Sequence, residues 1–279
     1  MNTTSFTYHR RYTGPLQAAI FDWAGTTVDY GSRAPVAVFV EVFRRRGVII
    51  TAQQARAPMG LEKKDHIRAI AQQPLVAEQW QAVHARAWAE DDVEAMYRDS
   101  LPLQAQCVAD YAELIPGTLE TLAACRARGI QIGSSTGYSR QIVDALLPAA
   151  ARHGYVPDSV VCPSDVPAGR PAPWMAFQNA SNLRVYPMAA LVKIGDTIPD
   201  IEEGLNAGMW TIGLTKSGNE LGLSEAEIVE LAPAELAARL APIERRMRQA
   251  GAHYVVETIA DIPPLLDAIA ARLRLGEQP

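Results

Sequence analysis

The stretch LQAAIFDWAGTTVDYG, residues 16–31, decides the fold of this 279-residue chain. It opens with a short, largely apolar run without alternation, which is typical of a strand buried in a parallel sheet. Asp22 follows directly, so its carboxylate is expected at the carboxyl end of that strand, where such sheets bind their ligands. Gly25 permits a tight turn, and the two threonines after it offer hydroxyl and N–H groups to an anion. Taken alone, Asp22 could equally cap the next segment.

Five more apolar runs follow along the chain, and helical patterns separate most of them. This alternation predicts an α/β fold, a Rossmann-like parallel sheet with helices on both faces. We expect strands at residues 130–133, 159–162, 191–194, 210–214 and, more weakly, 254–256, and helices at 118–128, 138–153 and 173–183.

One region, from about residue 32 to 109, has helical patterns and no convincing strand. Thr51 and Gln54 form a capping-box signature at the start of one of its helices. Because this insertion follows the first strand, we expect it to lie over the carboxyl ends of the sheet. We therefore predict an all-helical cap domain at 32–109, a core domain built from 16–31 and 110–279, and a flexible tail at 1–15.

The composition excludes several classes of protein. Lys and Arg number 26 against 31 Asp and Glu, a net charge of −5, which disfavours nucleic-acid binding because phosphate contacts need a basic surface. No apolar run is long enough to span a bilayer, so no membrane partner is expected. The three cysteines show no pairing or metal-binding spacing, which favours a reducing, cytoplasmic setting.

Acidic residues also end a later strand. Asp196 follows the run 191–194, and Asp200 is four residues further on, at the start of a predicted helix. Together with Asp22 they place three carboxylates at one edge of the sheet, where they would repel each other without a cation. A few hard oxygen ligands suit Mg²⁺. The alternative for Asp200 is a charge that stabilises a helix N-terminus.

Two further segments could hold a phosphate group. Thr136 and Gly137 follow the strand at 130–133 and precede a helix, so they offer a hydroxyl and N–H groups. Arg170 lies on a proline-rich loop, where its guanidinium could hold a phosphate group in a fork geometry. In isolation, these residues are equally compatible with an ordinary turn and a surface arginine.

The order of these motifs is more specific than any one of them. A strand followed by Asp, a strand followed by Ser and Thr, a cation on a loop, and a strand followed by Gly-Asp resemble the haloacid dehalogenase superfamily, from residue 16 almost to the end. Most members are phosphatases that carry a second Asp two residues after the first. Here Ala24 stands at that position, which argues against an ordinary phosphomonoesterase or sugar-phosphate mutase. A binding protein without activity is the other alternative.

Four segments closely resemble the phosphonoacetaldehyde hydrolases, or phosphonatases: FDWAGTTVDYG (21–31), PMGLEKKDH (58–66), VPAGRP (166–171) and NAGMW (206–210). The resemblance implies cleavage of a C–P bond to acetaldehyde and phosphate, in 2-aminoethylphosphonate degradation. It implies a lysine Schiff base, an aspartyl phosphate, a small phosphonate substrate and a homodimer formed through the cap. It places catalytic roles on Asp22, Lys63, His66, Met59 and Tyr138, substrate binding on Thr136, Gly137, Arg170 and Gly60, and Mg²⁺ on Asp22, Asp196, Asp200 and the backbone of Ala24.

Two adjacent lysines compete for the Schiff base. Helical spacing puts Met59, Lys63 and His66 on one face and turns Lys64 away. We therefore assign the Schiff base to Lys63, as the resemblance also does. A free lysine has a pKa near ~10.4, so Lys63 needs burial or a nearby cation to become a nucleophile at neutral pH. Ser32 occupies the position of a cysteine often seen in the family.

Overall fold

The computed structural model describes residues 11–279, apart from the side chains of residues 106–110. Most of the expected tail therefore lies outside the described residues. The core is a six-stranded sheet in the order β3-β2-β1-β4-β5-β6, and every pair is parallel. The strands are β1 (Ala18–Phe21), β2 (Gln131–Ser135), β3 (Ser159–Val161), β4 (Leu191–Gly195), β5 (Trp210–Leu214) and β6 (Tyr254–Val256).

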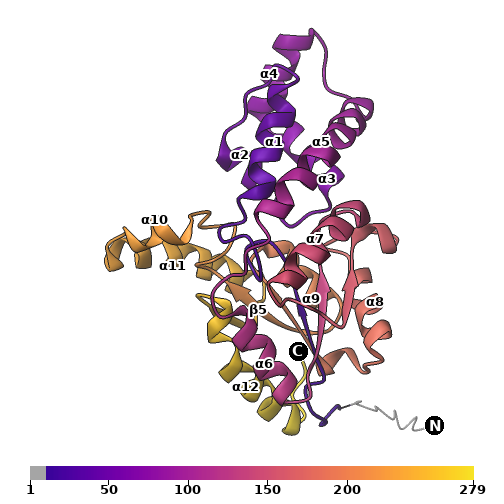
Figure 1. Cartoon of the computed structure of the whole chain (residues 1–279), viewed down its shortest axis with the longest axis vertical. Coiled ribbons are helices and arrows are strands. Elements are labelled where there is room, and N and C mark those ends of the chain that lie inside the picture. The colour runs from indigo at the N-terminus through magenta and orange to yellow at the C-terminus, as the bar shows by residue number, and fades with distance from the viewer. Residues whose placement is uncertain (1–10) are drawn as a thin grey trace, which may run out of the picture.

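Helices cover both faces of this sheet, as Figure 1 shows. Along β1, Ala19 and Phe21 pack into one apolar cluster and Ala18 and Ile20 into another, because successive side chains of a strand point to opposite faces. The first face is covered by α6 (Thr118–Ala127), α7 (Arg140–Arg152) and α12 (Pro263–Arg274). The second is covered by α8 (Trp174–Leu183), α9 (Ile198–Asn206) and α11 (Pro233–Gln249), and α10 (Glu225–Val229) lies beside α11 in Figure 1.

The inserted helices form a separate body above the sheet in Figure 1. They have an apolar cluster of their own, in which Phe39 and Phe43 are fully buried. The longest of them, α5, extends to the core and packs against α7. The expected fold class, a parallel α/β core with an all-helical cap, is confirmed. The cap helices are α1 (Ala34–Arg44), α2 (Ala52–Arg56), α3 (Lys63–Ala71), α4 (Pro74–His84) and α5 (Glu90–Asp110).

The start of α3 differs from the sequence prediction. The capping box predicted before α2 is present, with Gln54 N donating to Thr51 Oγ1 at 3.1 Å. The helical pattern that begins at residue 59 is not helical until Lys63, because Gly60 has a φ of +94° and Glu62 caps the helix. The argument that Met59 shares a helical face with Lys63 is therefore wrong.

In the part of the chain that the structure describes, no helix combines the length and the apolar character that a bilayer crossing requires.

Candidate active site

Three acidic residues meet at the carboxyl edge of the sheet. Asp22 follows β1 and Asp196 follows β4, and these strands are neighbours, with Phe21 in register with Ile194. Asp200 reaches the same place from the first turn of α9. One carboxylate oxygen from each lies within 4.8 Å of the others, and all three side chains are buried. The structure thus brings together the three carboxylates predicted to bind a metal.

The two carboxylates on the β4 side have different surroundings. Asp196 accepts hydrogen bonds from Thr26 Oγ1 at 3.1 Å and from Asn219 N at 2.7 Å. Burial, and then the nearby charges of Asp22 and Asp200, raise the pKa of Asp196 well above its usual range. Burial also tends to raise the pKa of Asp200, but the positive charges of Arg170 and of Lys193 on β4 outweigh burial and lower that pKa.

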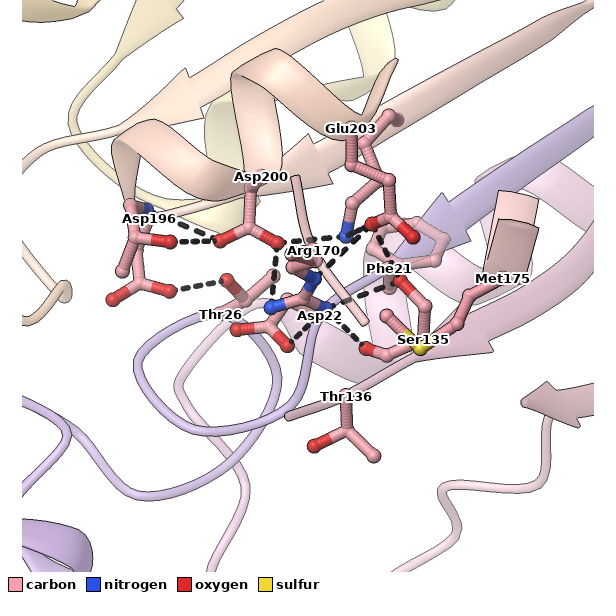
Figure 2. A network of polar contacts seen from close by, with 12 residues as sticks. Phe21, Asp22, Thr26, Ser135, Thr136, Arg170, Met175, Asp196, Asp200 and Glu203 are labelled. Atoms are coloured by element: carbon pink, nitrogen blue, oxygen red, sulfur yellow. Dashed lines mark hydrogen bonds and ion pairs between the residues drawn. The ribbon is translucent and has the colours of Figure 1, made fainter. Parts of the chain in front are cut away.

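A buried ion network built around Arg170 holds Asp22 and Asp200 in place (Figure 2). Arg170 Nη2 donates to Asp22 Oδ1 at 2.7 Å, Nη1 pairs with Asp200 Oδ1 at 2.9 Å, and Nε pairs with Glu203 Oε2 at 3.1 Å. Lys193 Nζ lies 2.8 Å from Asp200 Oδ1 and 3.4 Å from Glu203 Oε2. Arg170 is thus a buried ion-paired residue rather than a surface one, and in this structure its guanidinium faces carboxylates rather than an open phosphate site.

Sequence reasoning did not find two members of this network, Lys193 and Glu203. A signal was present: a lone lysine in the middle of the apolar strand LVKIG cannot reach solvent, so it needs a buried acidic partner. Glu203 is three residues after Asp200 on α9, which places both on one helical face. The predicted anion-binding role of two threonines is also wrong, because Thr26 donates to Asp196 and Thr27 donates to the carbonyls of Asp22 and Trp23.

The charges of the network fit a divalent cation. Among the described residues, four carboxyl groups, from Asp22, Asp196, Asp200 and Glu203, share one buried ion network with the cations Arg170 and Lys193, and Lys63 lies near Asp22 without pairing with it. Acidic groups therefore outnumber the cations in a buried place, where an unbalanced charge is costly. A divalent cation would offset this excess, and carboxylate oxygens are the ligands that hard cations take. Asp22 and Asp196 are its best-placed ligands, since Asp200 is already paired with both Arg170 and Lys193, whereas Asp196 forms no ion pair with a cation of the described residues.

A small cavity lies beside Asp22, between core and cap. Its volume is about 20 Å³, which is room for about one water molecule. On the core side Thr136, in the lower part of Figure 2, stands apart from the ion network and near Asp22. The cavity is lined by Asp22, Ala24, Ser32, Pro35, Met59, Gly60, Lys63, Thr136, Gly137, Tyr138, Arg170 and Thr197. Predicted residues from both domains therefore share one site.

Lys63 is the cap's charged residue in this cavity. Only 5% of it is exposed, and its Nζ lies 4.8 Å from the centre of the Tyr138 ring and 5.7 Å from that of Phe39. Among the described residues, no carboxylate forms an ion pair with it. Burial lowers the pKa of Lys63 to about 8, although the charge of Asp22 opposes the shift. Its neighbour Lys64 points outward and pairs with Glu94.

His66 is fully buried but does not line the cavity. Its Nε2 lies 2.8 Å from the carbonyl oxygen of Ala55, so Nε2 carries the proton and Nδ1 is left as an acceptor without a partner among the described residues. Burial, followed by the charge of Lys63, lowers the pKa of His66 well below its ordinary value. The ring stacks on Phe39 at 4.0 Å between centroids. His66 is thus a neutral imidazole one helical turn from Lys63.

The cap and the core approach each other closely at two glycines, Gly60 and Gly137, which have no side chain. A Cβ atom on Gly60 would lie 2.4 Å from Thr197 Oγ1, and one on Gly137 would lie 2.7 Å from the carbonyl oxygen of Leu61. Both distances are shorter than any real contact of a Cβ atom. Glycine at these two positions therefore permits the cap loop before α3 to close on the carboxyl edge of β2 and β4.

Known proteins resemble this chain along most of its length. Residues 16–208 match the family of haloacid dehalogenase-like hydrolases. A phosphonoacetaldehyde hydrolase of Syntrophobacter fumaroxidans is 53% identical over 98% of this chain and 99% of its own, and one of Bacillus cereus is 47% identical over 91% and 96%. The crystal structure of a phosphonoacetaldehyde hydrolase-like protein from Oleispira antarctica superposes with a TM-score of 0.96 at 40% identity, over 99% of this chain and 100% of that one.

These relatives align with both the sheet and the cap, so the likeness is not confined to a shared core. It confirms the resemblance that the four sequence segments indicated. The chain is a hydrolase that belongs to the haloacid dehalogenase-like family and, within it, to the phosphonoacetaldehyde hydrolases.

Proposed function

We propose that this chain hydrolyses the C–P bond of phosphonoacetaldehyde to acetaldehyde and phosphate, through a Schiff base on Lys63 and an aspartyl phosphate on Asp22. One observation carries the proposal: the small cavity is lined on one side by a buried lysine of the cap that no carboxylate of the described residues pairs with, and on the other by a carboxylate of the core. Such a pair can engage both ends of a two-carbon phosphonate at once. The names of the relatives support the substrate.

The chemistry needs an amine because carbon is a poor leaving group. When the C–P bond breaks, its electron pair stays on carbon. An iminium next to that carbon accepts the pair, and the product is an enamine rather than a carbanion. No acid is then needed to protonate a leaving oxygen. This agrees with Ala24 in the place where most of the superfamily carries its second Asp.

Each step then uses residues of the cavity. Lys63 condenses with the aldehyde and releases one water. The Asp22 carboxylate attacks phosphorus in line, the C–P bond breaks, and the electrons pass into the iminium. One water then hydrolyses the aspartyl phosphate, and another hydrolyses the imine that forms when the enamine is protonated on carbon. The net reaction consumes one water and gives phosphate and acetaldehyde.

The remaining residues position and balance these groups. Asp22 and Asp196 would hold Mg²⁺, with the backbone of Ala24, and Asp200 would act through water. The ion would neutralise phosphonate charge and orient the phosphorus toward Asp22. Thr136 and Gly137 would bind the phosphonate oxygens. Arg170 already contacts Asp22 Oδ1, so it orients the nucleophile and places positive charge where the transferred phosphoryl group arrives.

Proton transfer falls to groups near Lys63. His66 lies one helical turn from Lys63 and outside the cavity lining, and its Nδ1 has no hydrogen-bond partner among the described residues, so it would relay a proton by accepting a hydrogen bond there without itself staying protonated, because burial holds its pKa well below the ordinary value. The face of the Tyr138 ring lies against the lysine ammonium, which helps to hold it in the cavity. Met59 and Gly60 close the wall around the reacting amine.

The cap must move during turnover. The cavity has room for about one water, so the substrate cannot enter while the cap is closed. An open cleft of about 710 Å³ adjoins it, between Glu62 and Asp65 of the cap and the loop that carries Arg170, and Arg170 borders both spaces. This cleft offers a route once the cap loop shifts away from Gly137.

Homodimerisation through the cap is also proposed. Phe39 and Phe43 are not available for it, because they fill the cap's own core. Ile49, Leu75 and Val83 are exposed apolar residues of the cap and are candidates for the interface. Sedimentation of the wild-type chain beside a triple variant with polar residues at these positions tests this; equal masses for both would contradict it.

The proposed reaction is tested by measuring both products. Phosphate and acetaldehyde should appear together and in equal amounts from phosphonoacetaldehyde, only with Mg²⁺ present, and chelation should stop both. Borohydride added during turnover should leave a two-carbon adduct on Lys63, which peptide mass spectrometry locates, and Lys64 serves as the adjacent internal control. Phosphate release from sugar phosphates that survives Lys63→Ala would instead indicate an ordinary phosphatase.

A further inference from the structure

We infer that Arg56 of the cap and Asn219 of the core form a latch that couples closure of the cap to the geometry of Asp196. The latch is defined as the side chains of these two residues. The inference rests on the proposed function in one respect, namely that Asp196 is a ligand of the divalent cation. It assigns a positioning role to a cap residue that does not line the cavity.

Arg56 ends α2 and extends its guanidinium onto the core. Its Nη1 donates to the carbonyl oxygen of Gly31 at 2.7 Å and to that of Ser32 at 3.2 Å, in the segment that leads into the cap. The same nitrogen donates to Asn219 Oδ1 at 3.1 Å, and Nη2 donates to the carbonyl oxygen of Gly222 at 3.1 Å. Asn219 Nδ2 donates back to the carbonyl oxygen of Arg56 at 3.3 Å.

The segment that Arg56 grips also holds the metal-site carboxylate. The backbone N–H of Asn219 donates to Asp196 Oδ2 at 2.7 Å. A Cβ atom on the preceding Gly218 would lie 2.6 Å from Asp196 Cβ, so this segment lies directly against that side chain. Ser217 Oγ donates to the carbonyl oxygen of Gly25 at 3.0 Å, next to the loop that carries Asp22. Residues 217–219 therefore contact the metal site on one side and the cap on the other.

The contacts of Arg56 distinguish it from an ordinary surface arginine. The arginines Arg44, Arg68 and Arg86 of the cap pair with carboxylates of the cap itself. Arg56 forms no ion pair with a carboxylate of the described residues, and its donors are directed at backbone and amide oxygens of the core. Guanidinium supplies five donors in a rigid fork, so it can bond two segments at once in a fixed geometry, whereas a lysine offers three donors from a single nitrogen.

The latch has a thermodynamic consequence. With the cap closed, the guanidinium fork fixes the side chain of Asn219, and the backbone N–H of the same residue holds Asp196 Oδ2 in the position from which that carboxylate faces Asp22. If closure favours the ligand geometry, then cation binding must favour closure by the same factor, because coupling between two sites is reciprocal. The cap would thus close more firmly on a loaded metal site than on an empty one.

The test is a calorimetric titration of the full-length protein with MgCl₂ in the absence of substrate. Arg56→Met should weaken Mg²⁺ binding about tenfold, within the range of ordinary coupling between sites, and Arg56→Lys should recover only part of the loss. Arg86→Met is the matched control, because it removes a cap arginine that also bonds a carbonyl oxygen but does not contact the core, and it should leave the affinity unchanged.

Hydrogen exchange gives a second readout. Addition of MgCl₂ to the wild type should slow amide exchange in residues 52–71 of the cap, and it should not do so in Arg56→Met. The inference is overturned if folded Arg56→Met binds Mg²⁺ as tightly as the wild type, if Arg86→Met weakens binding equally, or if the wild type binds no Mg²⁺. Because neither readout uses a substrate, absence of a Lys63 adduct would overturn the proposed function and leave the latch standing.

Discussion

Two buried lysines, one in the cap and one in the core, have opposite surroundings. Lys193 on β4 is 0% exposed and has carboxylate oxygens at 2.8 and 3.4 Å, whereas Lys63 on α3 is 5% exposed and faces aromatic rings. Lys193 is held in place by its ion pairs with these carboxylates. Lys63 has a pKa lowered to about 8, which makes a neutral amine accessible. The comparison teaches that the partners of a buried lysine, rather than its burial, separate a structural residue from a nucleophile.

The largest expected effect is on activity at Lys63. Lys63→Met should lower kcat/KM by more than about 10⁴-fold, the scale of loss when a covalent group is removed. Steady-state release of phosphate and acetaldehyde measures it. A variant that keeps even a tenth of the wild-type rate would show that the cap lysine is not the nucleophile.

The two lysines should respond oppositely in stability. Lys193→Met leaves Asp200 and Glu203 partly unpaired and should lower the free energy of unfolding by about 3–5 kcal/mol. Lys63→Met should raise it by about 3 kcal/mol at pH 7, because burial of a protonated amine opposes folding. Urea unfolding of each variant measures both, and equal signs would contradict the comparison.

The direction of the pKa shift at Lys63 also determines how the stability gained in Lys63→Met depends on pH. The folded-state pKa of about 8 lies below the ordinary value of 10.5, so the unfolded chain binds more protons between these pH values. The gain from Lys63→Met is therefore full below pH 8 and disappears as the pH rises toward 10.5. Unfolding at pH 7 and pH 10 separates this effect from improved packing, which would not vary with pH.

A smaller effect is expected where the cap meets the core. Gly137→Ala adds a methyl group 2.7 Å from the carbonyl oxygen of Leu61 and should lower kcat/KM by about 10²-fold, since a misplacement of about 1 Å has that effect. Gly129→Ala is the control: nothing lies within 4 Å of its added methyl group, and the backbone strain that alanine meets at its φ of +69° should lower stability but not kcat/KM, because Gly129 does not line the cavity. Equal losses in both variants would mean that cap closure is not the cause.

The pH dependence of the wild type sharpens the comparison further. At pH 7 about one tenth of Lys63 is neutral, and at pH 8 about half, so kcat/KM should rise several-fold over that interval and level off above it. A pH profile with phosphonoacetaldehyde measures this. A flat profile between pH 6.5 and 8.5, at about constant Mg²⁺ occupancy, would contradict a rate that depends on the neutral amine.

The smallest effect is expected at Lys64. Its ammonium group is exposed and pairs with Glu94 at the cap surface. Lys64→Met should therefore leave kcat/KM within about twofold of the wild type, as exposed ion pairs contribute little. A large loss here would transfer the catalytic role to the neighbouring position.

The sequence predicted the sheet well because its strands are marked locally. Strands β5 and β6 begin and end where predicted, since Gly208 and Gly251, both with positive φ, stop the preceding helices. Strand β2 extends two residues beyond its apolar run. Ser134 and Ser135 belong to it because their backbones pair with β1 and β3, and their hydroxyls donate to the carbonyl oxygen of Phe21 and to Glu203, which are contacts that only the folded chain provides.

The sequence predicted the site residues that belong to a local motif. It did not predict the residues whose role depends on which side chains meet in the folded protein. Asp22 and Asp196 follow strand ends and Asp200 lies in the first helical turn after one of them, so their meeting could be deduced from the parallel order. The network of Lys193 and Glu203 needed knowledge of which face of α9 packs on β4. The start of α3 was mispredicted because the turn at Gly60 interrupts an apparently continuous helical pattern.

The near-absence of free volume beside Asp22 has a consequence for the pace of the reaction. The cavity has room for about one water molecule, so under the proposed function the cap would have to move away from the core in each catalytic cycle to admit the substrate and release the products. If that movement limits the rate, turnover should slow in proportion to the viscosity of added sucrose or glycerol. Opening of the cap, rather than cleavage of the C–P bond, would then set kcat.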